Sequence, residues 1–504
     1  MTGCTMVGPD FTTPTATVSA DWQPVETEGV TTTSSDLAGW WRALDDETLN
    51  SLIDQAVRQN LSLQLAGIRI FEARAQLGIA AGLQYPQVQQ ARGGFGHVEQ
   101  SENFPNSSSL LDNSFRDADI GFDAGWEIDI WGRYRRGIEA ADANLLAQVA
   151  GYDDALVSLT AEVANAYVAI RTFEAQLAIA HDNVAIQQRS LEIATVRFES
   201  GATTALDVEQ ARTLVARTQA SIPLFEIGLR QAHNALNILL GLPPGELSEF
   251  ATGTGEIPTA PDEIGVGIPA DLLRRRPDIR RAELQAAAQS AVIGVVESDL
   301  YPQFSLTGTV GLRSSDTGST DLGDLFDSDS IEAGIGPSFR WNIFNYGRIK
   351  NAVRVEDARF QQAVVNYQNT VLRAANEVEN ALVAFARGQQ RVAFLDDSVI
   401  AARRSVELAL VQYRDGTVDY TRVLDTQSAL VVQQDEYTAA QGTVIRDLIA
   451  TYKALGGGWQ IRSETGVLPE PVREDMKSRT DWGDLLEPDT PEVPESDGLR
   501  KPDW

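Results

Sequence analysis

The sequence predicts an α+β membrane protein built from two internal repeats, each with a β-hairpin followed by a long helical hairpin. Three observations carry this prediction: a self-similarity at a shift of 215 residues, four segments that alternate apolar and polar residues, and two very long apolar seams at helical spacing. A fixed shift of this kind indicates structural units with the same order of elements.

The repeat is visible as short matches spread along the chain. Gly132-Arg133 returns as Gly347-Arg348, Gly201 returns as Gly416, and Leu240-Gly241 returns as Leu455-Gly456, all at a shift of 215. The prediction divides the chain into four parts: an extended N-terminal segment (1–44), repeat 1 (45–260), repeat 2 (261–459) and an acidic, largely disordered C-terminal tail (460–504).

Each repeat is predicted to open with a helix, over about 45–83 in repeat 1 and about 269–300 in repeat 2. The basic cluster Arg274 to Arg276, followed by Arg280 and Arg281, is interpreted as a surface patch near the start of the second helix. A net charge of −30 argues against a nucleic-acid partner for it.

A β-hairpin follows in each repeat, over 86–131 and 302–345. From Ala118 to Ile130 the residues alternate between apolar and polar without interruption; 304–313 and 331–343 do the same, and 87–98 is the weak partner. Runs of about 11 to 13 such residues have the length of a strand that crosses a bilayer at a tilt. One such strand would favour a half-buried sheet in a soluble domain, but four of them favour the membrane.

Aromatic residues lie where these strands meet the helices, as a belt at the membrane interface would. The predicted interface aromatics are Tyr85, Trp126, Trp131, Tyr301, Trp341, Phe344 and Tyr346. Four strands cannot close a barrel, and an open sheet edge cannot face lipid. The barrel must therefore be shared between copies of the chain, and a symmetric ring is the simplest closure.

A long helical hairpin completes each repeat, over 134–241 and 346–456. Apolar residues recur in alternating steps of four and three from Leu145 to Phe198, interrupted only by Gln187, and again from Phe360 to Tyr413. A seam sustained over about eight heptads indicates a coiled coil. Such a helix would be roughly 100 Å long at 1.5 Å per residue.

The tip of each helical hairpin is marked by a glycine. Gly201 and Gly416 are placed to end the two long helices in the left-handed conformation. A new helix begins at once, because Thr204 to Asp207 resembles a capping box and Asp419 can cap the second copy. Both tips are therefore predicted to lie far from the strands.

The composition adds two constraints. The sequence holds no run of about 18 apolar residues, so it predicts no transmembrane helix. Its one cysteine excludes an intrachain disulfide. Gly3-Cys4 resembles the end of a bacterial lipoprotein signal, although the charged region and apolar core that precede such a cysteine are absent. Together with the predicted strands and the Thr/Pro-rich stretch after it, this motif predicts lipidation of Cys4.

Enzymatic functions have little support. The histidines, His97, His181 and His233, have no partner at the spacing of metal ligands. The run Gly456 to Gly458 follows a helix and lacks the Lys-Ser/Thr of a phosphate-binding loop. We expect no catalytic residue, no metal site and no cofactor.

Several motifs together resemble those of the TolC-like outer-membrane efflux proteins, in the lipoprotein branch typified by OprM. The residues that carry this resemblance are Trp40-Trp41 with Leu49 and Leu52, Tyr85-Pro86, Leu240-Gly241, Leu272-Leu273 with Arg276-Pro277-Asp278-Ile279 and Ala282-Glu283, and Tyr452 to Trp459. The resemblance implies a homotrimer with a twelve-stranded barrel in the outer membrane of a Gram-negative cell, continued by a helical tunnel across the periplasm. It also implies a passive exit duct for small molecules, fed by an inner-membrane RND-type pump through a periplasmic adaptor.

The resemblance further implies that the hairpin tips form a closed gate at the periplasmic end. Asp425 matches a pore-facing aspartate of the family, although Thr421 and Ser428 depart from the usual neighbours. Asp425 can equally be a solvated residue of the helix surface, and Tyr413 can be gate or core. The residues expected to dock the adaptor are Gly201, Thr203, Thr204, Leu206, Gly416, Asp419 and Thr421.

Two other functions remain open from the sequence. A duct for type I protein secretion differs only in its partners, so the neighbouring genes would distinguish it. A coiled-coil structural protein without a pore is opposed by the amphipathic strands, and failure to fractionate with outer membranes would favour it.

Overall fold

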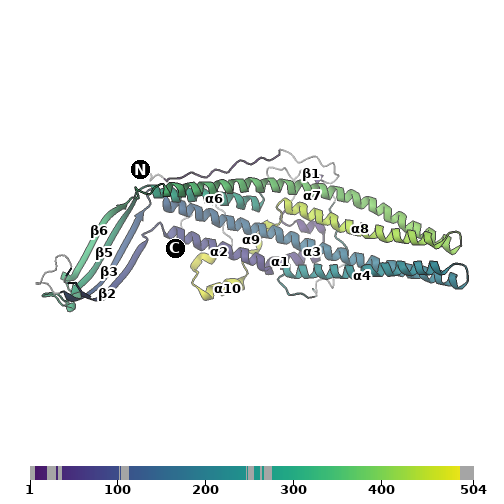
Figure 1. The fold of residues 1–504 in the computed structure, drawn as a ribbon, viewed down its shortest axis with the longest axis horizontal. Coiled ribbons are helices and arrows are strands. Elements are labelled where there is room, and N and C mark those ends of the chain that lie inside the picture. Colours follow the sequence, from purple (N-terminus) through teal and green to yellow (C-terminus); the bar gives the residue numbers. More distant parts are fainter. Residues whose placement is uncertain are drawn as a thin grey trace.

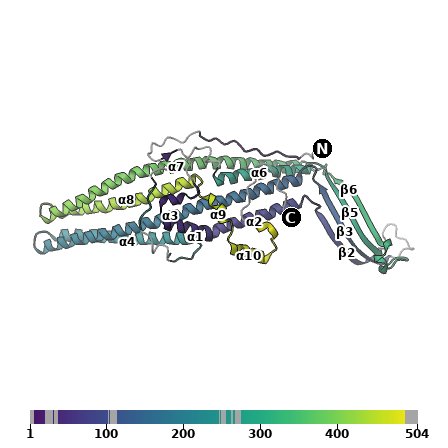
Figure 2. The same ribbon diagram turned by 180° about the vertical axis from the view of Figure 1, so that it is seen from behind.

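The computed structural model describes residues 6–19, 30–31, 37–101, 103, 113–245, 247, 255–261, 264–265 and 275–487. The molecule is elongated, with a β-sheet at one end, a helical body, and the tips of two helical hairpins at the other end (Figures 1 and 2). In the described part of the chain, no helix is both long and apolar enough to cross a membrane. The main elements are α1 (Glu47–Gln59), α2 (Leu61–Gly82), β2 (Val88–Glu99), β3 (Ser114–Ile128), α3 (Arg133–Glu199), α4 (Ala205–Leu239), α6 (Pro277–Glu297), β5 (Gln303–Ser315), β6 (Ile331–Arg340), α7 (Arg348–Arg414) and α8 (Tyr420–Ala454).

The predicted repeat is confirmed by the order and length of these elements. The helices α3 and α7 both contain 67 residues, and α4 and α8 both contain 35. Each element of the second pair starts 215 residues after its counterpart, while α6 starts 216 residues after α2. We call residues related by these shifts repeat mates.

The four long strands form one antiparallel sheet in the order β2-β3-β5-β6. The central pairing of β3 with β5 joins the two repeats, with Phe122 opposite Val310. The strands β2 and β6 form the two edges, so their outward N–H and C=O groups have no strand partner within the chain. An edge of this kind at membrane depth requires another chain.

Apolar seams hold the helical hairpins together, as the spacing predicts. Leu156, Val163 and Ile170 of α3 are buried, and so are Val371 and Val378 of α7. The main core lies in the middle of the body, where α1 packs on α3 and the Trp40 ring stacks on Tyr452 with centroids 5.2 Å apart.

The predicted helix over 45–83 is wrong in one respect, because it is two helices that meet at Asn60. Asn60 has an extended backbone (φ −63°, ψ 121°) and ends α1. Its side chain accepts a hydrogen bond from the Leu63 N–H at 2.8 Å and donates one to the Leu239 carbonyl at 2.8 Å. The side chain thus caps α2 and fixes it to the end of α4.

The predicted helix over 269–300 starts later than expected, since α6 begins at Pro277. A residue before proline is disfavoured in the helical conformation, and Arg276 accordingly has an extended backbone (φ −68°, ψ 126°). Residues 269–274 lie outside the described residues.

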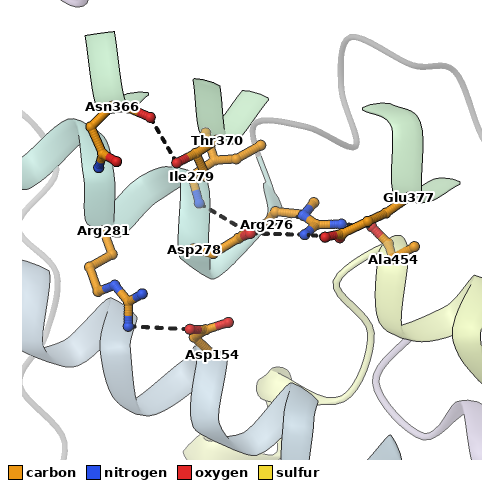
Figure 3. A network of polar contacts seen from close by, with 9 residues as sticks. All are labelled: Asp154, Arg276, Asp278, Ile279, Arg281, Asn366, Thr370, Glu377 and Ala454. Carbon is orange, nitrogen blue, oxygen red and sulfur yellow. Dashed lines mark hydrogen bonds and ion pairs between the residues drawn. The ribbon is translucent and has the colours of Figure 1, made fainter. Parts of the chain in front are cut away.

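The interpretation of Arg276 as part of a surface patch is also wrong, because this side chain is buried (Figure 3). Its guanidinium donates to the Ala454 carbonyl at the end of α8, to the Asp278 carboxylate at 2.8 Å, and to the Glu377 carboxylate of α7 at 2.7 Å. One arginine therefore ties α6 to α7 and satisfies a carbonyl that α8 leaves without a helical partner.

The prediction of a disordered tail is wrong for residues 460–487. Helix α10 (Glu470–Arg479) and the turn after it pack on the body, with Met476 and Leu486 buried. Arg462 pairs with Asp153 of α3 at 3.2 Å. Burial raises the pKa of Asp153 to about 7, although Arg462 acts in the opposite direction. Residues 488–504 lie outside the described residues.

Candidate functional site

The two faces of the sheet differ sharply in chemistry. One face carries apolar side chains that are exposed in the single chain, listed as Phe95, Ile120, Phe122, Val310, Ile335 and Phe339. On the other face Arg92 pairs with Asp119 and Asp123 at 3.6 and 3.3 Å, and Arg313 pairs with Asp117 at 3.1 Å. An apolar face of this size requires a non-aqueous environment, whereas the charged face requires water.

Two glycines keep the middle of the charged face thin. Gly121 and Gly311 lie opposite each other on β3 and β5. A Cβ atom on Gly121 would lie 2.8 Å from the Val310 carbonyl oxygen, and one on Gly311 would lie 2.7 Å from that of Ile120. No side chain can therefore project there without moving the strands apart.

All seven predicted interface aromatics lie at or near the junction of sheet and helices. The indole N–H of Trp126 donates to the Gln84 carbonyl at 3.1 Å, and that of its repeat mate Trp341 donates to the Leu300 carbonyl at 3.0 Å. Tyr346 is fully exposed in the single chain. Their contact with the membrane interface remains a prediction.

Gly201 and Gly416 end the long helices as predicted, with φ values of 74° and 78°. The following N–H groups, of Ala202 and Thr417, return to carbonyls of the last helical turn. The side-chain caps are wrong: Thr204 and Asp419 occupy the N-cap positions but make no capping hydrogen bond. Instead, the Thr203 hydroxyl bonds the Asp207 carboxylate.

A polar network that the sequence did not reveal joins the two tips. Tyr413 is 2% exposed, and its hydroxyl donates to Asp207 of α4 at 3.2 Å. The Arg197 guanidinium lies 4.6 Å from the centre of the Tyr413 ring and donates to the Tyr413 and Arg414 carbonyls. Burial raises the pKa of the Tyr413 hydroxyl, and the charge of Asp207 adds to this. The network holds the second hairpin tip against the first.

A comparison of repeat mates could have pointed to this network. Arg197 and Asp207 are charged, but their repeat mates at 412 and 422 are Gln and Arg. A charge that is present at only one of two related tips indicates a contact between the tips rather than within each hairpin.

Asp425 is exposed and lies apart from the Tyr413 network. It lines a groove of about 400 Å³ between α4 and α8, together with Leu206, Glu209, Arg217 and Ser428. The other predicted docking residues are exposed at the tips, except Thr203, which is half-buried. Among the described residues there is no group of three or more acidic, histidine or cysteine side chains that could hold a metal ion.

The chain is similar to known proteins over most of its length. A family model for outer membrane efflux proteins matches residues 52–242 and 268–457. The chain is 31% identical to the pyoverdine export outer membrane protein OpmQ of Pseudomonas putida, over 84% of this chain and 89% of that protein. It is 29% identical to the cation efflux system protein CusC of Escherichia coli, over 91% of this chain and 97% of that protein.

Solved structures show the same similarity. The outer-membrane channel OprN matches with a TM-score of 0.83 and 31% identity, over 90% of this chain and 99% of that chain. The open state of the MtrE outer membrane channel of Neisseria gonorrhoeae matches with a TM-score of 0.77 and 26% identity, over 90% of this chain and 98% of that chain.

Proposed function

Because the chain belongs to the outer membrane efflux protein family, we propose that it is the exit duct of a tripartite efflux system and that its two ends have separate roles. The protein is a trimer that works with a periplasmic adaptor and an inner-membrane pump. Its sheet contributes to a barrel in the outer membrane, and its helices continue the duct into the periplasm. The separation of a charged and an apolar face on one uncovered sheet carries this assignment.

The helical body accounts for the length of the duct. A helix of 67 residues is about 100 Å long at 1.5 Å per residue, and α3 and α7 run side by side with it along the body (Figure 1). The duct itself needs no chemistry, because the pump supplies the energy. The lumen-facing side chains then need only to remain wet and to leave the passage open.

We place the gate at the hairpin tips. Tyr413 supports it from within the chain, because its contacts with Asp207 and Arg197 hold the two tips together. Asp425 supports it from the duct side, because it is exposed beside the groove between α4 and α8. The exposed tips, from Gly201 to Leu206 and from Gly416 to Thr421, remain the surface that we propose for the adaptor.

Replacing Asp425 should change the ion selectivity of the duct. Three copies around a narrow axis would concentrate negative charge and favour cations. In planar bilayers, Asp425→Ala should reduce the preference for cations, and Asp425→Arg should reduce it further. The matched control is Asp397→Ala, which removes an exposed carboxylate from α7 farther from the tips. Wild-type selectivity in both Asp425 variants would place the constriction at other residues.

Lipidation of Cys4 remains a proposal, because Cys4 lies outside the described residues. Its neighbours support the proposal. The Val7 N–H donates to the Trp131 carbonyl at 3.0 Å, and Arg136 donates to the Val7 and Gly8 carbonyls. The chain just after Cys4 is thus fixed at the junction of sheet and helices, where an acyl chain can reach the membrane.

Labelling should test this anchor directly. The full-length gene product should incorporate radioactive palmitate, and Cys4→Ser should not. Because the barrel itself inserts into the membrane, we expect the variant to lose efficiency rather than all export. Equal labelling of both proteins would show that the motif at Cys4 is accidental.

A further inference from the structure

An aromatic contact joins the end of the first β-hairpin to the start of the second. The Trp131 ring, just after β3, stacks on the Tyr301 ring, just before β5, with centroids 4.6 Å apart and planes 25° apart. The indole N–H of Trp131 also donates to the Pro302 carbonyl at 2.9 Å. Since β3 and β5 are neighbours in the sheet, this contact fastens repeat 1 to repeat 2 where the barrel meets the helices.

The same pair of aromatic positions occurs at the open edges of the sheet. The repeat mate of Trp131 is Tyr346, which follows the edge strand β6, and that of Tyr301-Pro302 is Tyr85-Pro86, which precedes the edge strand β2. The side chains of Tyr346 and Tyr85 are 102% and 46% exposed. They lie at opposite edges of a four-stranded sheet, so they cannot meet within one chain.

The helices beside them show the same asymmetry. Helix α6 packs against both α3 and α7. Its repeat mate α2 packs against α3, and among the described residues it makes no comparable contact with α7. If each α2 repeats the environment of α6, its missing neighbour is α7 of another copy.

The apolar residues of α7 support this assignment. On α3, Ala150 and Val157 flank Asp154, which pairs with Arg281 of α6 at 3.2 Å (Figure 3). Ala150 and Val157 are 2% and 5% exposed. Their repeat mates on α7, Val365 and Leu372, are 53% and 51% exposed. Apolar residues that are covered in one repeat and open in the other indicate a surface completed by a second copy.

The backbone at Tyr346 favours a specific role. Its φ of 51° is in the left-handed region, which strains a residue with a bulky side chain. Trp131 does not share this conformation, since Asp45 and Tyr346 are the non-glycine residues with positive φ in the described part of the chain. The strained turn directs the Tyr346 ring outward, beyond the edge of its own sheet.

We propose that Tyr346 of one copy packs on Tyr85 of the next copy, while α2 of that next copy covers Val365 and Leu372. Each boundary between repeats around the trimer then carries one aromatic pair, whether the boundary lies within a chain or between chains. The proposal rests on the trimeric duct above. It differs from the sequence prediction, in which these two tyrosines serve only the membrane interface.

Cross-linking between introduced cysteines tests the contact. In membranes, the double variant Tyr346→Cys/Tyr85→Cys treated with a short bismaleimide should run as dimers and trimers on denaturing gels. The matched control is Trp131→Cys/Tyr301→Cys, the pair of repeat mates, which should cross-link within the chain and remain monomeric. The two single variants of the edge pair, which also retain Cys4, should give no ladder.

The outcomes separate this contact from the trimer itself. If the edge pair stays monomeric on the gel while light scattering in detergent gives a trimer, the proposed contact is wrong and the duct stands. If light scattering gives a monomer, both are wrong.

A second variant keeps the test valid if cysteine at these positions prevents folding. Tyr346→Gly removes the ring and relieves the positive φ, so it should not harm the single subunit. We expect it to lower the temperature at which the trimer dissociates in SDS, and Tyr346→Trp, which copies the repeat mate, to retain most of the wild-type value. An unchanged dissociation temperature in Tyr346→Gly would mean that the ring contacts lipid alone.

Discussion

Replacing Arg276 by alanine should destabilise the folded subunit by roughly 3–5 kcal/mol, the range for removing one partner from a buried ionic cluster. The substitution would leave the Ala454 carbonyl without its donor and the Asp278 and Glu377 carboxylates without their shared cation. Chemical unfolding in detergent, followed by circular dichroism, measures the loss. Arg276→Lys should lose part of it, because an ammonium group cannot reach all three partners in the same geometry.

The matched control comes from the same basic cluster. Arg275 is adjacent in sequence but exposed. Arg275→Ala should therefore change the free energy of unfolding by about 0.5 kcal/mol or less. Equal losses in the two alanine variants would mean that the cluster acts through its total charge, and that the contacts in Figure 3 contribute little.

Replacing Tyr413 by alanine should open the periplasmic end of the duct. The variant loses the packing of a buried aromatic ring, which costs about 3–5 kcal/mol in protein cores, and it frees Asp207 and Arg197 from the contacts that join the tips. We expect a higher mean single-channel conductance in planar bilayers. The effect should be large because the network lies at the end of two long helical hairpins, away from the main core (Figure 1).

Two further variants identify the cause of this opening. Tyr413→Phe keeps the ring and loses the hydrogen bond to Asp207, so it should give a smaller rise, in line with about 0.5–1.5 kcal/mol for one hydrogen bond. Thr421→Ala changes an exposed side chain at the same tip and should leave the conductance unaltered. Wild-type conductance in Tyr413→Ala would show that the tips are held by other contacts.

Periodic features of the sequence predicted the structure well. The long seams predicted helices of nearly the observed length, because a side chain at every third or fourth position must be buried for the coiled coil to form. The uninterrupted alternation from Ala118 to Ile130 placed β3 within a few residues. The open sheet edges followed from the number of strands and from the cost of unpaired backbone groups in lipid.

Single side chains with long-range partners were not predictable in this way. Asn60 breaks a helix because its amide reaches Leu239, and Arg276 is buried because α7 and α8 supply its acceptors. The acidic composition of the tail suggested disorder, but Met476 and Leu486 find apolar surface on the body. Contacts between residues far apart in the chain leave no periodic signal. The Tyr413 network escaped notice for the same reason, although the unequal charges of the two tips were visible.

The molar mass of the detergent-solubilised protein tests the central claim most directly, since four strands with two open edges can form a channel only as a shared barrel. Multi-angle light scattering should give a protein mass of about three times the 54.8 kDa of one chain. A monodisperse monomer that retains the circular dichroism of its β-sheet would contradict the shared barrel.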